Sequence, residues 1–202
     1  MPLNQSPTFL SFALNACNDA SPSGVTDVVT GQPIYIGDLD LGVYFDLTEA
    51  EANSLSYTTN GTLHSGRYRR ILVDSGATAA YVKTGTIGLL ASAAKGVNVI
   101  TSYDQGTAGL RPVVFLNVIT PGNYGFVQEL GDATVLGKTS GVTNVSPAIG
   151  DIINCIATGV AEDLATPGSI IATTIGMALT APNHTSTTSF RVLLENVPVV
   201  QG

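Results

Sequence analysis

Charge is what this 202-residue sequence has least of, since Asp, Glu, Lys and Arg make up only 11% of it. The usual share is about 25%. Thr, Ser, Asn, Gly and Ala take their place, while hydrophobic residues reach 44%, enough to expect a folded core. A surface poor in Lys and Glu loses little side-chain entropy when another protein covers it. The composition favours a subunit of a permanent assembly, with an ordinary β-protein of neutral surface as the alternative.

Basic residues are scarce as well: eight Lys and Arg stand against fifteen Asp and Glu, a formal net charge of −7. Binding to phosphates needs clustered Lys and Arg, so no nucleic-acid partner is expected. The one basic cluster, Arg67, Arg69 and Arg70, is too small for such a surface. We expect it to pair with carboxylates across a subunit boundary or to lie in solvent.

Long apolar runs and metal-binding motifs are also missing. No stretch approaches the ~20 apolar residues of a membrane span, and no basic segment followed by an apolar one opens the chain. We therefore expect no membrane partner and no secretion signal. Cys17 and Cys155 lack motif spacing, and His64 and His184 are expected at the surface, so no metal site and no cofactor are predicted. Two buried, reduced thiols are the expectation.

Strand patterns and turn residues fill most of the chain. From Pro33 onward, alternating or β-branched segments are separated by turn signals about every 8–12 residues, which predicts a mainly β fold, a β-barrel or sandwich. One short helix is expected at about residues 47–56, where Thr48 and Glu51 form a capping-box pattern. Residues 1–32 are expected to be an extended N-terminal arm. Residues 33–202 would be the β-domain, with a division near 95–110 left open.

Finer patterns place individual strands. The segment RYRRILVDSGATAAYVKTG predicts two strands around a turn, the second running through Tyr81 and Val82 to Lys83. Pro112 indicates a sheet edge or the start of a strand. In TIGMAL, a period of two would put Ile175 and Leu179 on one face, with Met177 between them, and Gly176 would permit close backbone approach.

One segment carries a catalytic pattern. In ILVDSGATAAYV an apolar strand leads into Asp-Ser-Gly-Ala, beginning at Asp74, which resembles the catalytic segment of retropepsin-like aspartic proteases. Such enzymes are dimers in which each chain contributes one Asp. A second motif of that family has only a distant counterpart in Ile175-Gly176, and Asp, Ser and Gly are also ordinary turn residues. The sequence therefore favours a turn and no enzymatic activity, with a dimeric protease using Asp74 as an alternative.

Several stretches are similar to structural proteins of tailed-bacteriophage particles. They are TPGNYGFVQELGDATVL and the C-terminal series GDIINCIATGVAED, SIIATTIGMAL and FRVLLENVPVV. The pattern resembles head decoration, or cement, proteins with a small β-barrel. Its pieces are the Pro121-Gly122 turn, an aromatic-Gly-x-Val-Gln strand, the Gly150-Asp151 turn, an Ile-Gly-x-Ala-Leu strand and a closing apolar strand.

The resemblance implies a non-catalytic decoration protein made in the host cytoplasm. It would form homotrimers and bind the major capsid protein on the capsid exterior, stabilising the assembled shell. Another virion component, such as a head–tail, tail or fibre protein, is the alternative. The candidate inter-subunit contacts are apolar residues of the arm and the arginine cluster, namely Phe9, Leu10, Phe12, Arg67, Arg69 and Arg70.

Overall fold

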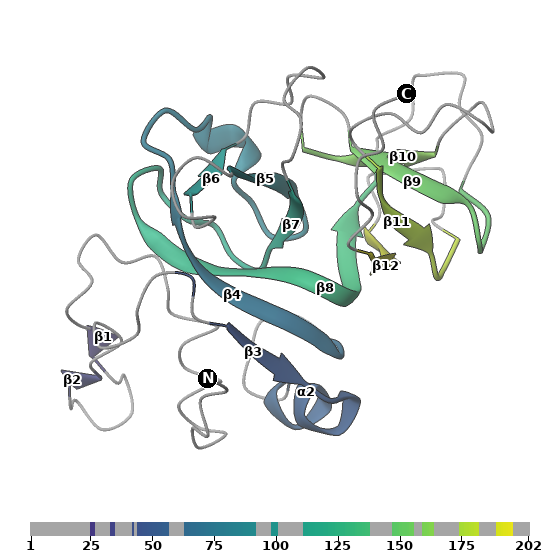
Figure 1. Cartoon of the computed structure of the whole chain (residues 1–202), viewed down its shortest axis with the longest axis horizontal. Helices are drawn as coiled ribbons and strands as arrows, with labels where there is room; N and C mark the ends of the chain where they lie inside the picture. Colours follow the sequence, from purple (N-terminus) through teal and green to yellow (C-terminus); the bar gives the residue numbers. More distant parts are fainter. Residues whose placement is uncertain are drawn as a thin grey trace.

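The described part of the chain is mainly β with one short α-helix, which confirms the predicted fold class. The computed structural model describes residues 25–26, 33–34, 42, 44–56, 63–91, 98–100, 111–137, 147–155, 159–163, 174–181 and 189–195. The helical elements are α2 (Glu49–Ser56) and the 3-10 turn η2 (Ala79–Tyr81). The strands (Figure 1) are β1 (Val25–Thr26), β2 (Pro33–Ile34), β3 (Tyr44–Leu47), β4 (Gly66–Val73), β5 (Ile87–Ala91), β6 (Asn98–Ile100), β7 (Arg111–Phe115), β8 (Tyr124–Leu136), β9 (Ile152–Cys155), β10 (Ala161–Asp163), β11 (Thr174–Ala178) and β12 (Ser189–Leu194).

Ten of the described strands form one sheet in the order β10-β9-β11-β12-β8-β7-β5-β6-β4-β3. Because β8 also pairs with β4, the pairings from β4 through β8, β7, β5 and β6 lead back to β4. The sheet as a whole is open and is not a closed barrel, with β3 and β10 as its end strands. Every pairing between the described strands is antiparallel except that of β4 with β6. β1, in the predicted arm, pairs with β2, the first two residues of the predicted β-domain, in a separate two-stranded sheet. The other arm residues lie outside the described ones.

The long strand β8 joins the two halves of the sheet. Its first part pairs with β4 and β7, and its second part, from Gly131 to Leu136, pairs with β12. In Figure 1, β4 and β8 are the two long curved ribbons; β5, β6 and β7 lie near one end of β8, and β9 to β12 lie near the other. Gly131 has a φ of +91°, and a Cβ there would lie 2.6 Å from the Cα of Gly66 on β4. The junction therefore depends on a residue without a side chain.

Within the described ranges, the core forms two buried clusters, and β8 contributes to both. One lies among β4, β5, β7 and the first part of β8, and contains Ile71, Val73, Val82, Leu90, Val113, Phe115, Ile119 and Val127. The other lies mainly among the second part of β8 and β9 to β12, and contains Ile87, Val114, Ala133, Val135, Ile153, Cys155, Ala161, Ile175, Ala178, Phe190, Val192 and Leu194. Cys155 is thus buried as predicted, while Cys17 lies outside the described residues.

The helix begins with the predicted capping box. The backbone N–H of Thr48 donates to the Glu51 carboxylate at 2.8 Å, its hydroxyl donates to the same carboxylate at 2.7 Å, and the Glu51 N–H donates to the Thr48 hydroxyl at 3.3 Å. The bond from the Thr48 backbone, followed by that from its side chain, holds the pKa of Glu51 below its ordinary value. The helix begins at Glu49, two residues later than expected, because Leu47 is the last residue of β3.

Two strand predictions need correction. The strand expected through Tyr81 to Lys83 is wrong: a 3-10 turn ends at Tyr81, and β5 begins only at Ile87. The Thr86 hydroxyl oxygen lies 2.7 Å from the carbonyl oxygens of both Tyr81 and Lys83, so a side chain satisfies backbone groups that a strand would pair. Pro112 does stand at the start of β7, but β7 lies between β5 and β8 and is not an edge strand.

The second correction concerns β11. The strand has a register shift between Thr174 and Gly176, so the simple period of two fails there. Ile175 is buried while Met177 is exposed, and the two side chains point to opposite faces. The predicted close approach at Gly176 is confirmed, since a Cβ there would lie 2.8 Å from the Leu193 carbonyl carbon.

Candidate functional site

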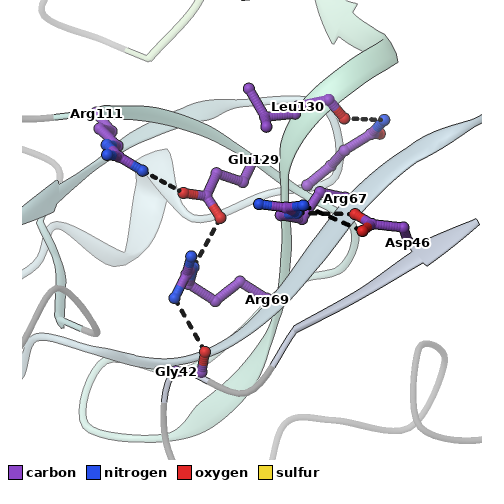
Figure 2. A network of polar contacts seen from close by, with 8 residues as sticks. Gly42, Asp46, Arg67, Arg69, Arg111, Glu129 and Leu130 are labelled. Carbon is purple, nitrogen blue, oxygen red and sulfur yellow. Dashed lines mark hydrogen bonds and ion pairs between the residues drawn. The ribbon is translucent and has the colours of Figure 1, made fainter. Parts of the chain in front are cut away.

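Arg67, the first residue of the predicted arginine cluster, binds a carboxylate of its own chain. Its Nε and Nη2 atoms donate to Asp46 Oδ1 and Oδ2 at 2.8 and 3.1 Å, a two-bond pairing across the β3–β4 ladder (Figure 2). The guanidinium also lies 4.2 Å from the centre of the Tyr44 ring. Both side chains of the pair are partly exposed, 31% for Arg67 and 60% for Asp46, so water screens their attraction.

Arg69 takes part in a more deeply buried pairing. Its Nε donates to Glu129 Oε2 at 2.7 Å, while Arg111 Nη1 donates to the other oxygen, Oε1, at 3.0 Å. Figure 2 shows the Glu129 carboxylate between the two guanidinium groups, and Arg69 also donating to the carbonyl of Gly42 at 2.9 Å. The Glu129 side chain is only 2% exposed. One buried carboxylate therefore joins side chains from β4, β7 and β8.

Arg70 and Arg191 complete the chain's five arginines. Arg70 is 2% exposed, and its guanidinium lies 5.6 Å from the centre of the Tyr124 ring. Arg191 binds Asp132 through two bonds, Nε to Oδ1 at 3.0 Å and Nη2 to Oδ2. Four of the five arginines are thus paired with carboxylates of the same chain and the fifth is buried.

The sequence left two options for the arginine cluster, carboxylates across a subunit boundary or solvent, and this pairing matches neither. Arg67 and Arg69 do bind carboxylates, but those carboxylates belong to the same chain. No local pattern in the sequence indicates that Glu129, Asp132 and Arg191 form ion pairs, because their partners lie 18 to 60 positions away along the chain. Contact of the arginines with another subunit stays a prediction. Phe9, Leu10 and Phe12 lie outside the described residues.

His64 lies in a second polar region, beside the Arg191–Asp132 pair. The expectation of a surface position is wrong, since this histidine is only 8% exposed. Its Nε2 lies 3.1 Å from the hydroxyl of Thr134, and its carbonyl accepts a 2.6 Å bond from the Tyr68 hydroxyl. Burial lowers the pKa of His64, the positive charge of Arg191 lowers it further, and Glu49 opposes the shift. Burial also raises the pKa of Tyr68 above its ordinary value.

The lowered pKa of His64 predicts a loss of stability in mild acid. The unfolded chain takes up a proton at an ordinary histidine pKa while the folded chain resists it, so the free energy of unfolding falls as pH drops through about 6.5. We expect His64→Gln to flatten this dependence between about pH 7.5 and about pH 5.5. Urea unfolding at several pH values measures it. Equal slopes for the two proteins would contradict the assignment.

Asp74 lies in a tight turn directly after β4. Its carboxylate accepts the Gly76 N–H at 2.7 Å, and its carbonyl accepts the Ala77 N–H at 2.9 Å. The carboxylate thus serves the turn, the interpretation that the sequence favoured. Among the residues that the structure describes, no group of three or more His, Cys, Asp or Glu could hold a metal ion. No helix in that part of the chain has the length and apolar character to cross a membrane.

The turn predicts that Asp74→Asn is tolerated. The amide oxygen of Asn can accept the same bond from Gly76, and Asn suits such turns as well as Asp, so the free energy of unfolding should change by less than about 0.5 kcal/mol. Asp74→Ala removes the acceptor and should cost about 1 kcal/mol. Thermal unfolding of the two variants tests this. If the protease alternative held, Asp74→Asn would abolish a peptide cleavage that the wild-type chain performs, although the variant stays folded.

No protein-family model and no curated protein matches the sequence. Among solved structures, the chain is similar to the N base of the head fibre protein gp8.5 of bacteriophage phi29. The TM-score is 0.43 and the sequence identity 10%, over 66% of this chain and 98% of that one. At this TM-score and identity, the similarity assigns neither a family nor a function to the chain.

Proposed function

We propose that the chain is a non-catalytic structural component of a tailed-phage virion, and within it a head decoration protein. It would form homotrimers and bind the major capsid protein on the capsid exterior, holding the assembled shell together without cofactor, metal or nucleic acid. The sequence resemblance to cement proteins suggests the class. The observation that carries the proposal is the internal pairing of the arginines, which leaves few basic groups to desolvate when a partner covers the surface.

The turn after β4 is an example of a surface with few charged side chains. Ser75, Gly76 and Thr78 are exposed and uncharged, and so are Ala79 and Ala80 in η2. Hydrogen bonds from Gly122 N to Val73 O and from Val73 N to Asn123 O, both 2.9 Å, hold the β7–β8 loop beside the end of β4. Small neutral side chains lose little entropy on burial, and repetition over a lattice multiplies weak contacts.

Deleting the arm, residues 1–32, tests the proposed mode of binding. We expect occupancy on shells to fall, because apolar arm residues are candidate contacts, while the described sheet that begins at β3 keeps its melting transition. Occupancy is measured by incubating purified chain with shells that lack it and quantifying the bound fraction. A matched variant replaces Phe9, Leu10 and Phe12 by Ser in the full-length chain. Unchanged occupancy in both would exclude the arm from shell binding.

Copy number separates decoration from the alternative of a head–tail, tail or fibre protein. Quantitative mass spectrometry of purified particles should give a ratio to the major shell protein near that of a lattice component. A ratio corresponding to one ring per particle would favour a connector or tail position and contradict the decoration role.

A further inference from the structure

An apolar row crosses three strands on the face of the sheet that is turned away from the buried cluster. Ile152 of β9 is the Cα partner of Met177 of β11, and Met177 is the partner of Leu193 of β12. Ile152 is 42% exposed and Met177 36%, while Ile149, in the turn before β9, is 71% exposed. These are three of the four exposed large hydrophobic side chains in the described part of the chain; the fourth is Val118.

When one face of an antiparallel sheet is buried, the side chains on its exposed face are normally polar. A row of apolar side chains on that face is therefore unusual. The register shift in β11 produces it: Ile175 and Gly176 are both buried, and Met177 follows on the opposite face. In a regular strand without this register shift, Met177 would lie on the same buried face as Ile175. An interruption of the strand thus places a flexible apolar side chain at the centre of an open face.

The charges beside the row are complementary to each other. Arg191 and Glu195 stand two residues before and two residues after Leu193. The Arg191 side chain is 41% exposed even though it binds Asp132, and Glu195 is exposed. A two-fold axis along the row maps the row onto itself and reverses the strand direction. Arg191 of one protomer then faces Glu195 of the partner subunit, and the apolar residues meet their own counterparts.

We propose that a second copy of this chain covers the row Ile152–Met177–Leu193 across a two-fold axis that runs along it. The row is the apolar centre of the contact, and Arg191 and Glu195 form its polar rim, the usual arrangement of an interface. Although each copy carries a net charge of −7, this contact buries no unpaired charge in the row. The proposal does not depend on a position in a virion. The homotrimer of the proposed function would use a different surface, because a three-fold axis does not bring one row onto itself pairwise, and the two contacts together would give a hexamer.

Cross-linking tests the geometry directly. Under mild oxidation, Met177→Cys should form a disulfide-linked dimer on non-reducing gels, because equivalent positions meet across the axis. Val118→Cys is the control, an apolar position away from the row that is more exposed than Met177, 61% against 36%. The wild-type chain, which already contains Cys17 and Cys155, gives the background. Cross-linking of the Val118 variant to the same extent, or none with the Met177 variant, would overturn the proposal.

Sedimentation equilibrium tests the energetics on the full chain. The wild type should associate as a dimer or a multiple of dimers, and Met177→Glu should raise the dissociation constant at least about tenfold, with Val118→Glu unchanged. Thermal melts establish that both variants are folded. A wild-type monomer at all concentrations, a trimer that Met177→Glu leaves intact, or equal effects of the two variants would refute the contact. Shell binding is measured in a separate experiment, so failure of the decoration role can be distinguished from failure of the two-fold contact.

Discussion

Gly131→Ala is expected to destabilise the protein by about 2–5 kcal/mol, the sum of roughly 1–2 for a left-handed non-glycine residue and roughly 1–3 for overpacking. Gly131 has a φ of +91°, and its added Cβ would lie 2.6 Å from the Cα of Gly66, where only backbone can give way. This is a large part of the about 5–15 kcal/mol by which a domain is stable. The free energy of unfolding in urea measures the effect.

Gly150→Ala is the matched control, since it separates backbone strain from lack of space. Gly150 has nearly the same φ, +96°, but no atom lies within 4 Å of its added Cβ. Gly150→Ala should therefore lower the free energy of unfolding by the backbone strain alone, about 1–2 kcal/mol. If the two variants lost the same stability, the close approach of β4 and β8 at Gly131 would not explain the destabilisation by Gly131→Ala.

Glu129→Gln is expected to cost about 3 kcal/mol, the lower end of the range for breaking a buried ion pair. The amide leaves two guanidinium groups without a counter-charge, and its NH₂ group faces one of them. The loss stays at the lower end because the Arg111 side chain is 53% exposed and water can solvate it, whereas Arg69 is 18% exposed. Urea unfolding at low and at high salt measures the cost, which should change little with salt.

Asp46→Asn is the control for the loss of Glu129, because it removes the same kind of carboxylate from an arginine. The Arg67–Asp46 pair is exposed on both sides, so its loss should cost less than about 1 kcal/mol and shrink further in high salt. Equal losses in the two variants would show that burial of Glu129 does not determine its contribution.

Features that depend on near neighbours in the sequence were predictable. Thr48 and Glu51 stand three residues apart, and their capping box forms with the expected bonds. The turn at Asp74 follows from the ability of an Asp side chain to bond the N–H two residues ahead. Both hydrogen-bond patterns join residues two or three positions apart, so they do not depend on how distant parts of the chain pack.

Features that depend on distant partners were not predictable. Nothing near Glu129 indicates that Arg69 will pair with it, because the two lie 60 positions apart and meet only when β4 pairs with β8. The same holds for His64, which is buried because Thr134 and Arg191 arrive from β8 and β12. The direction of Met177 was misjudged for another reason: a single register shift reverses every later side chain in a strand.

The division of β8 between two sets of partners has a consequence during synthesis. When Leu136 leaves the ribosome, β4 and β7 are already present to pair with the first part of the strand, but β12 is not. Until Ser189–Leu194 has been made, the second part of β8 presents an unsatisfied edge on which another nascent chain could pair. During synthesis the pairing of β12 with β8 therefore closes a long loop late, and the polypeptide is exposed to misassembly in the interval before it.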